Sequence, residues 1–149
     1  MKLFLAAPFT DRLADAGLGL QPEYRHWLES VIRVLEGRGH EVLSAHRKER
    51  WGHAVDPPDI ALTRDFEWIR ASDLVIAYVG DPPSPGVQME LGYAAAFEKP
   101  VLVFRTDTRV PYLIDGLHSV TRAHILTIAS RDEIAVALLS IDLQKISQI

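Results

Sequence analysis

The sequence predicts a three-layer α/β fold, flavodoxin-like or Rossmann-like, in which helices flank a five-stranded parallel sheet. Short apolar runs alternate along the chain with segments of helical periodicity, the pattern of a parallel sheet covered by helices. The run from Leu74 to Val79 is β-branched and apolar on both faces, as a central parallel strand must be. The length of 149 residues suits one domain spanning 1–149, because about 100–150 residues is the commonest domain size.

The chain begins with a strand and a helix. Leu3 to Ala7 is an apolar run that predicts the first strand. From Tyr24 to Leu35, apolar residues recur at i, i+3, i+4, i+7, i+8 and i+11, which predicts an amphipathic helix. Gly37 and Gly39 end this helix. A second strand is expected from Glu41 to Ala45.

The middle of the chain alternates between breaker-rich and periodic segments. His46 to Pro58 is polar and rich in helix-breaking residues, so an irregular loop or lid is expected there. A helix from about Asp59 to Ala71 follows, and the DPPSPG stretch ends the central strand Leu74 to Val79. A helix from Gly86 to Phe97 is then closed by Lys99-Pro100.

The last third of the chain supplies two more strands. Val101 to Phe104 is expected as the fourth strand and His124 to Ile128 as a weaker fifth, with a short helix from Leu113 to Leu117 between them. A final helix is expected from an apolar stripe. The stripe consists of Ile134, Ala137, Leu138 and Ile141.

Composition excludes several classes of function. The formal net charge is −4 and no Lys/Arg run exceeds the short HRKER stretch, so a nucleic acid polymer is not an expected partner. The absence of cysteine excludes disulfides, thiolate metal sites and a cysteine nucleophile. The apolar start, MKLFLAAPFT, is too short for a signal peptide or a membrane span, so we expect a cytoplasmic protein with no membrane association.

The fold class predicts where a ligand would bind. In open parallel sheets, ligands bind at the carboxyl ends of the strands, near a topological switch point. Three segments follow predicted strands and therefore supply candidate residues. They are Ala7, Pro8, Phe9 and Thr10 after the first strand, Gly80 to Glu90 after the central strand, and Arg105 to Arg109 after the fourth.

The segment SPGVQMELGYA has the features of an anion site. It begins where the central strand ends and runs into a helix, whose free N–H groups and positive dipole end favour an anion. Ser84 adds a hydroxyl donor, and Gly86 allows a ligand to approach the backbone closely. The pattern is neither a Walker loop nor GxGxxG, so by itself it does not identify the anion.

Glu90 is the more informative residue of this segment. It shares a helix face with Val87, Leu91 and Ala94, the stripe that should turn toward the sheet. One interpretation is a first-turn acid stabilised by the helix dipole. The other is a functional carboxylate, which burial beside a Ser/Gly loop favours.

Asp65 shows the same anomaly on the preceding helix. Leu62, Asp65 and Ile69 lie at i, i+3 and i+7, so this acid interrupts an apolar stripe that should be buried. A buried acid is costly without a use or a partner. The alternative to a functional role is an ion pair with Arg64 or Arg70.

The histidines and Trp51 carry less information. The six histidines show no metal-ligand spacing, so we expect most of them on the surface or in loops and predict no metal site. Trp51 lies in the irregular segment, where it could stack on a base or pack locally.

Three stretches together resemble the nucleoside 2-deoxyribosyltransferase superfamily. They are LFLAAPF, TRDFEWIRASDLVIAYV and SPGVQMELGYAAAFEKPVLVF, which extend in order over most of residues 3–105. The E-L-G-Y-A block preceded by a Gly loop is the most specific part. The resemblance implies that Glu90 attacks the anomeric carbon and forms a covalent glycosyl-enzyme intermediate, a reaction open to a carboxylate. It also implies that Asp65 lies near the substrate, where it orients the sugar or helps to protonate the departing base.

At Ser84 this sequence resembles the branch of the superfamily that hydrolyses nucleoside monophosphates, which has Ser at the matching place. Transferases that act on free nucleosides commonly have an acid at the matching place. A carboxylate about 4 Å from a phosphate charge would cost roughly 4 kcal/mol per charge pair, whereas a hydroxyl donates a hydrogen bond. Phe4 stands where members acting on deoxy substrates often have Tyr. Losing that hydroxyl would make room for a 2'-OH and favours a ribonucleotide such as CMP, but Phe4 equally suits a core strand.

The resemblance also implies a homodimer or higher homo-oligomer with active sites near the subunit interface. In the family, a polar residue from the loop after the fourth strand can complete the neighbouring site. That region here reads RTDTRVPYLIDGLHS and lacks the Asn familiar from transferases. The candidates are Asp107, Arg109, Asp115 and Ser119, and Arg109 could approach the phosphate.

The leading hypothesis is hydrolysis of the N-glycosidic bond of a nucleoside 5'-monophosphate, with no metal or redox cofactor. The products would be a free base and ribose 5-phosphate or its deoxy counterpart. One alternative is a transferase that moves deoxyribose between bases, and another is a non-catalytic nucleotide-binding sensor. The base is left open, because Phe9, Thr10 and the segment from His46 to Pro58 shape its pocket.

Overall fold

A computed structural model describes residues 1–15, 17–107 and 111–148, and it has the predicted α/β fold. Five strands form one parallel sheet in the order β2-β1-β3-β4-β5. The strands are β1 (Lys2–Ala6), β2 (Glu41–Leu43), β3 (Leu74–Tyr78), β4 (Val101–Arg105) and β5 (Ala123–Thr127). The central strand β3 and its neighbour β4 are buried at every position, as strands covered on both faces must be.

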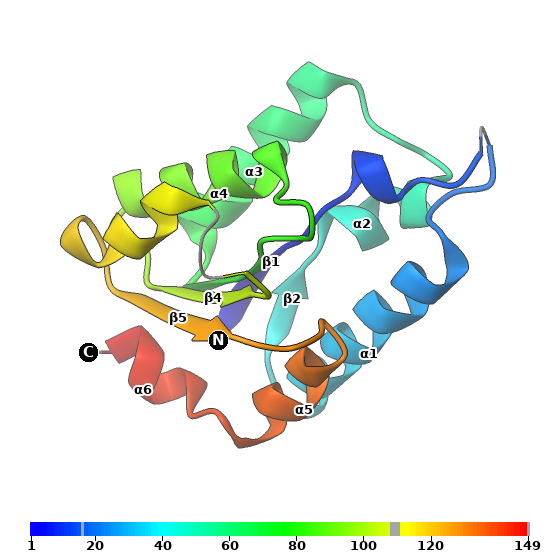
Figure 1. The fold of residues 1–149 in the computed structure, drawn as a ribbon. Coiled ribbons are helices and arrows are strands. Elements are labelled where there is room, and N and C mark those ends of the chain that lie inside the picture. The colour runs from blue at the N-terminus through cyan, green and yellow to red at the C-terminus, as the bar shows by residue number, and fades with distance from the viewer. Residues whose placement is uncertain (16, 108–110, 149) are drawn as a thin grey trace.

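Helices cover both faces of the sheet (Figure 1). One face carries α1 (Pro22–Gly37), α5 (Glu133–Ser140) and α6 (Leu143–Gln148), and the other carries α3 (Pro58–Ala71), α4 (Pro85–Ala96) and the 3-10 helix η3 (Tyr112–Ser119). Short helical turns follow the first two strands: η1 (Thr10–Arg12), α2 (Ala45–Lys48) and η2 (Arg50–Gly52). Side chains alternate between the faces along each strand, so Leu3 and Leu5 enter one apolar core and Phe4 and Ala6 enter the other.

Helix α1 has the predicted amphipathic stripe. Its six predicted apolar positions, from Tyr24 to Leu35, are all buried. Each fully buried large apolar side chain contributes about 1.5–3 kcal/mol relative to an exposed one. The helix ends at Gly37, and Gly39 has a φ of 81°, a conformation that glycine adopts without steric cost.

The segment after β2 differs from the prediction. The strand ends at Leu43, because the Oγ of Ser44 accepts a hydrogen bond from the N–H of Arg47 at 3.2 Å and caps a helical turn. Ala45 therefore belongs to α2 and not to the strand. The expected irregular loop is partly helical, and two of its side chains, His46 and Glu49, are buried.

Helix α3 also departs from its predicted stripe. Ile69 is fully buried as expected, but Leu62 is 46% exposed, so the stripe that Asp65 was expected to interrupt does not exist. The helix instead packs against α4 through aromatic contacts. The ring of Phe66 lies 5.2 Å from that of Tyr93 and 4.7 Å from that of Phe97, measured between centroids.

The end of the chain contains one more helix than expected. The predicted final stripe is divided, because Ile141 follows the end of α5 in an extended conformation. Helix α6 then adds Leu143 and Ile146 to the core beneath the sheet. Every helix in the described ranges is too short or too polar to span a bilayer.

The topology places the switch point between β1 and β3. These strands are neighbours in the sheet, but the chain passes from β1 to β2 on one side and from β3 to β4 on the other. The connections that leave their carboxyl ends therefore diverge, and a crevice between them is the expected ligand position.

Candidate active site

A cavity of about 530 Å³ lies at the carboxyl ends of β1, β2 and β3. Its walls are the turn after β1, the segment that begins with α2, the first half of α3 and the start of α4. Most of the residues that the sequence placed at the substrate line this cavity. They are Ala7, Phe9, Thr10, Asp65, Ser84, Gly86 and Glu90.

The start of α4 presents polar groups to the cavity. Ser84 is the N-cap, and its Oγ accepts a hydrogen bond from the N–H of Val87 at 3.4 Å. This bond uses an oxygen lone pair, so the hydroxyl proton remains able to donate. The N–H of Gly86 has no hydrogen-bond acceptor among the residues that the structure describes. The helix start therefore offers a hydroxyl and an N–H group to an anion, where the helix dipole also favours one.

Two glycines in this region have different roles. Gly80 has a φ of 95°, and a Cβ there would lie 2.6 Å from Cγ of Pro8, so the turn after β3 requires glycine. At Gly86 a Cβ would lie 3.7 Å from Oγ of Ser84, which is an ordinary contact. The packing of the chain itself does not require glycine at 86, and the open space there is available to a ligand.

Glu90 lies in the second turn of α4, on the face that the sequence predicted. Val87, Leu91 and Ala94 of the same face are buried against the sheet. Burial raises the pKa of the Glu90 carboxyl well above its ordinary value, nearby Asp65 raises it further, and Arg64 partly offsets both effects. Within the described ranges no side chain forms an ion pair or hydrogen bond with this carboxylate. It therefore lines the cavity without being held by a described ion pair.

The raised pKa of Glu90 predicts a pH-dependent cost to stability. The folded state binds this proton more tightly than the unfolded state, so stability should fall as pH rises from the ordinary carboxyl value toward the raised one. Glu90→Gln should therefore melt at a higher temperature than the wild type at pH 8, with an advantage that shrinks toward pH 4. For a chain of this size each ~1 kcal/mol corresponds to roughly 2–4 °C. The measurement is the melting temperature across this pH range, with exposed Glu98→Gln as the control. If both variants had the melting temperature of the wild type at every pH, the raised pKa of Glu90 would be contradicted.

Asp65 forms the ion pair that was the alternative to a functional role, and it also lines the cavity. Its Oδ1 accepts from Nε of Arg64 at 2.9 Å. Burial raises the pKa of Asp65, the positive charge of Arg64 lowers it, and the carboxylates of Glu49 and Asp56 raise it, with a net increase. A carboxyl group with a raised pKa beside a second carboxylate is a suitable proton donor or acceptor.

Two of the predicted substrate residues, Phe4 and Pro8, do not line the cavity. Phe4 is fully buried in the core on the α3/α4 side of the sheet, which fits the interpretation as a core residue. The carbonyl oxygen of Pro8 accepts hydrogen bonds from the Tyr24 hydroxyl at 2.5 Å and from Nε2 of His46 at 3.0 Å. These bonds hold the turn after β1 in place. Arg109 lies outside the described residues.

The segment after β4 does not reach the cavity in the part that the structure describes. Arg105 is buried, and its Nη2 donates to Oδ1 of Asp115 at 2.8 Å. Thr106 and Asp107 are not among the lining residues. The hydroxyl of Ser119 donates to the carbonyl of Gly116 within η3. Among the described residues, therefore, the site is formed by the segments after β1, β2 and β3.

His46 is a site residue that the sequence did not single out, because most histidines were expected on the surface or in loops. It is 2% exposed, lines the cavity, and its ring centroid lies 4.8 Å from that of Phe9. Burial lowers its pKa to about 4, so the imidazole is neutral near pH 7. Its place directly after the second predicted strand was the available signal. Trp51, by contrast, packs locally beneath the guanidinium of Arg25, 5.2 Å from its centroid, and does not line the cavity.

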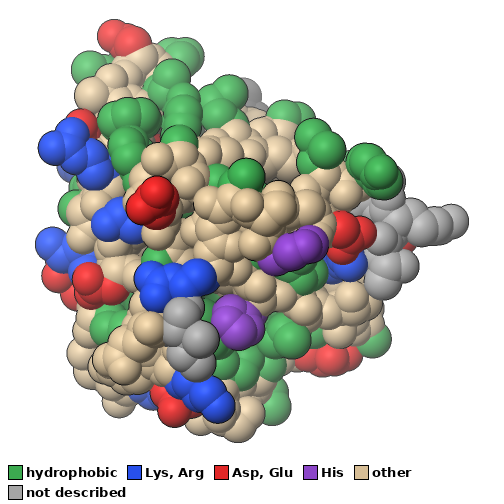
Figure 2. All heavy atoms as spheres, turned by 90° about the vertical axis from the view of Figure 1, so that its left-hand side faces the viewer, with side chains coloured by type: hydrophobic (Ala, Val, Ile, Leu, Met, Phe, Trp, Pro, Cys, Tyr) green, Lys and Arg blue, Asp and Glu red, His purple; other side chains and the backbone are tan. Residues whose placement is uncertain are grey.

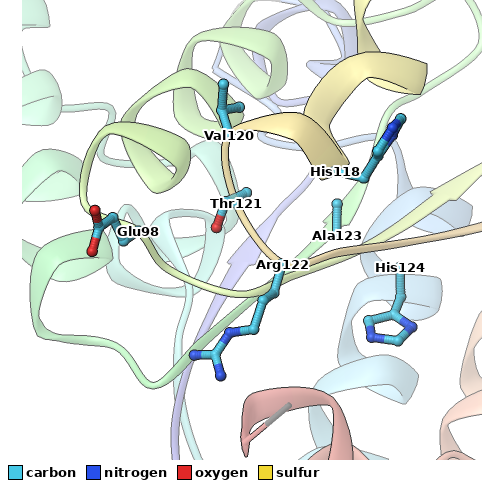
Figure 3. Close-up of a pocket in the computed structure, with 7 residues that line it drawn as sticks. All are labelled: Glu98, His118, Val120, Thr121, Arg122, Ala123 and His124. Atoms are coloured by element: carbon cyan, nitrogen blue, oxygen red, sulfur yellow. The ribbon is translucent and has the colours of Figure 1, made fainter.

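A larger hollow, of about 580 Å³, lies at the opposite edge of the sheet, before β4 and β5. Its polar side chains include Glu98, His118, Arg122 and His124, and they point in different directions (Figure 3). On the face of the molecule shown in Figure 2, charged side chains of both signs are interspersed with apolar ones. In the described ranges, no group of three or more His, Asp or Glu side chains is arranged so that it could hold a metal ion. The paired carboxyls and the helix start make the carboxyl edge the better candidate.

Comparisons with known proteins found a matching family model and several similar proteins. Residues 14–129 match the family model described as nucleoside 2-deoxyribosyltransferase. A Syntrophotalea carbinolica protein, named for a 2'-deoxynucleoside 5'-phosphate N-hydrolase activity, is 36% identical over 83 residues, which is 54% of this chain and 57% of that relative's length. The structure of the CMP N-glycosidase BcmB from Clostridium botulinum is similar with a TM-score of 0.69 and 27% identity, covering 93% of this chain and 97% of that one. The solution structure of BlsM gives a TM-score of 0.76 at 28% identity, covering 97% and 90%.

Proposed function

The chain belongs to the nucleoside 2-deoxyribosyltransferase family, and from this premise we propose that it hydrolyses the N-glycosidic bond of a nucleoside 5'-monophosphate. One observation carries the proposal. The Glu90 carboxyl, free of ion pairs with described residues, shares one cavity with the uncapped N–H of Gly86 and the Ser84 hydroxyl. A nucleophile and an anion site are thus held on the same short helix start, within reach of one small substrate.

The proposed reaction is a double displacement. An oxygen of Glu90 bonds to C1' while the C1'–N bond breaks, and the electron pair leaves on the base nitrogen, which takes a proton from Asp65. Water then attacks C1', gives its proton to Asp65, and displaces the carboxylate of Glu90. The products are the free base and the sugar 5-phosphate, and both carboxyl groups return to their initial states.

Asp65 is proposed as the proton donor because its pKa is raised, which suits a group that must hold and then release a proton. The alternative is that it only orients a sugar hydroxyl. The two roles differ in how strongly the rate of an Asp65→Asn variant should depend on the leaving group.

Ser84 and Gly86 are proposed to hold the 5'-phosphate. Ser84→Ala should raise KM for a monophosphate by about 5–10-fold through loss of one hydrogen bond to a charged group, and should cost about 1 kcal/mol of stability through loss of the cap. Ser84→Asp should raise KM by about 100-fold or more, because its charge repels the phosphate, while it keeps a capping oxygen. Steady-state kinetics with a monophosphate and its nucleoside measure both. Equal effects of Ser84→Asp on the two substrates would place the phosphate elsewhere.

For the sugar, we propose that a ribonucleotide such as CMP is favoured over a deoxyribonucleotide. Similarity over 93% of the chain to a CMP N-glycosidase supports this preference, and the shorter match to a relative named for a deoxynucleotide opposes it. Phe4 no longer contributes to the argument, because it lies in the core. A homodimer or higher homo-oligomer is retained as a proposal from the family resemblance, and a cytoplasmic location is retained as a separate proposal.

The proposed function is tested by incubating the protein with ribo- and deoxynucleoside monophosphates, each beside its dephosphorylated form, and measuring the free base. Base release that depends on the phosphate is the expected result. A transferase, the second candidate within the same family, would instead prefer the nucleoside and form a new nucleoside when a second base is added. Tight nucleotide binding without base release would favour a sensor.

A further inference from the structure

Arg64 is the centre of a charged cluster in the cavity wall. Its guanidinium contacts three carboxylates, those of Glu49 at 3.0 Å, Asp56 at 2.6 Å and Asp65 at 2.9 Å. The side chain is 10% exposed and lies over the ring of Trp68, 5.2 Å from its centroid. A planar guanidinium can make several such hydrogen bonds at once, which a lysine ammonium cannot do with the same geometry.

The cluster joins parts of the site that are far apart in sequence. Glu49 is 4% exposed, and while its Oε2 binds Arg64, its Oε1 accepts from the backbone N–H of Asp56 at 2.7 Å. The segment after β2 is thereby attached to α3 through one arginine. Asp65 is held by Oδ1, and no described residue donates a hydrogen bond to its Oδ2. One defined oxygen of this carboxyl group is therefore available to a substrate.

The charge balance of the cavity gives Arg64 a second role. Five acids line the cavity, and Arg64 is the one Lys or Arg among its described lining residues. The acids are Asp11, Glu49, Asp56, Asp65 and Glu90. The groups facing Arg64 are Glu49 and Asp56 from the segment after β2, Asp65 from its own helix, and Glu90 from α4 through its field. His46 from α2 feels the same field but is neutral near pH 7. Arg64 is thus the cation that allows these carboxylates to be close together.

We propose that Arg64 is a positioning residue, which fixes Asp65 through one oxygen and supplies the positive charge against which Asp65 and Glu90 ionise. It acts on the reaction through these two carboxyl groups and does not itself contact the reacting atoms. The inference rests on the proposed function for its kinetic consequences, but its electrostatic part concerns the carboxyl groups alone.

The first test is the pH profile of kcat/KM for base release. Loss of the positive charge in Arg64→Gln should move the acidic limb to higher pH by about one unit, with a drop of about 10–100-fold at the optimum. Arg64→Lys should keep the limb near its wild-type position, because the charge remains. It should still lower kcat/KM by about 10-fold, because an ammonium lacks the planar set of guanidinium donors. The control is Arg70→Gln on the same helix, an arginine whose side chain is 64% exposed, which should leave the profile unchanged.

A second variant, Glu49→Gln, should shift the pH profile of kcat/KM in the opposite direction. It keeps the proposal testable if Arg64→Gln does not fold. Glu49 raises the pKa of Asp65, so Glu49→Gln should move the alkaline limb, which reports loss of the Asp65 proton, to lower pH while its amide oxygen can still accept from Asp56. Uniform loss of activity with unmoved limbs in Arg64→Gln and Glu49→Gln would indicate a merely structural role and overturn the proposal.

The third measurement does not need turnover. Titration of carbon-13-labelled Asp and Glu carboxyls by NMR should show higher midpoints for Asp65 and Glu90 in Arg64→Gln. The increase should be smaller in Arg64→Lys, because the positive charge remains. If the wild type releases no base, the proposed function fails, and this titration still decides whether Arg64 controls the pair. Unmoved midpoints in a folded Arg64→Gln variant would reject the inference, whatever the substrate is.

Discussion

Glu90→Gln is expected to lower the rate of base release by about 10⁴-fold or more without unfolding the protein. The amide has nearly the same size as the carboxylate but cannot form the glycosyl ester, so the first displacement has no nucleophile. Because the carboxylate makes no ion pair with a described residue, its removal leaves no buried partner unpaired. Substrate binding should persist, since the phosphate groups contact Ser84 and Gly86 in the proposal.

The measurement is single-turnover release of base from a nucleoside monophosphate, with binding followed separately by calorimetry. Glu98→Gln is the matched control, because Glu98 follows the same helix and is exposed at the opposite edge of the sheet. Near-normal turnover in Glu90→Gln would remove the covalent mechanism. Loss of binding and turnover together would instead indicate that Glu90 organises the cavity.

Asp65→Asn is expected to lower the rate by about 10²–10⁴-fold for a natural nucleotide, the usual range for loss of a general acid. The loss should be much smaller for a sugar 5-phosphate that carries 4-nitrophenol, a leaving group that departs without a proton. An orienting role for Asp65 predicts equal losses for both substrates, because the sugar is the same. The comparison of the two rates therefore distinguishes proton donation from orientation.

The control for Asp65→Asn is Glu67→Gln on the same helix, where the acid is exposed and only 3.9 Å from Arg70 in a weak surface pair. It should leave both rates unchanged. The Asn variant also keeps an oxygen that can accept from Arg64, so the cluster around Arg64 should remain assembled. Thermal unfolding of both variants checks this expectation.

The strands and helices were predictable because their signals are local. Helix α1 shows this best, since the period of its apolar residues alone gives the buried face. The errors arose where a single side chain decided the structure. Ser44 ended β2 by capping a helical turn, and Leu62 of α3 is exposed because that helix packs on α4 by its aromatic residues, a contact that periodicity does not reveal.

The candidate site was predictable to the extent that it follows the sheet. Ser84, Gly86 and Glu90 come directly after a central strand, and the switch-point rule places them at the cavity. His46 follows β2 in the same way but was discounted as a loop histidine. Of the two positions left open for Phe4, strand alternation decides for the core, because it turns that ring into the apolar cluster beneath α3 and α4.

The amino-acid sequence by itself determined the order of strands and helices, the family, and the carboxylate that begins the proposed chemistry, since each depends on residues close together in the chain. The tertiary structure alone decided which charges surround that carboxylate. Arg64 meets Glu49 and Asp56 only after the segment behind β2 folds against α3. Ionisation in the cavity is set by burial and by charges within a few ångströms, and those distances do not exist until the layers pack.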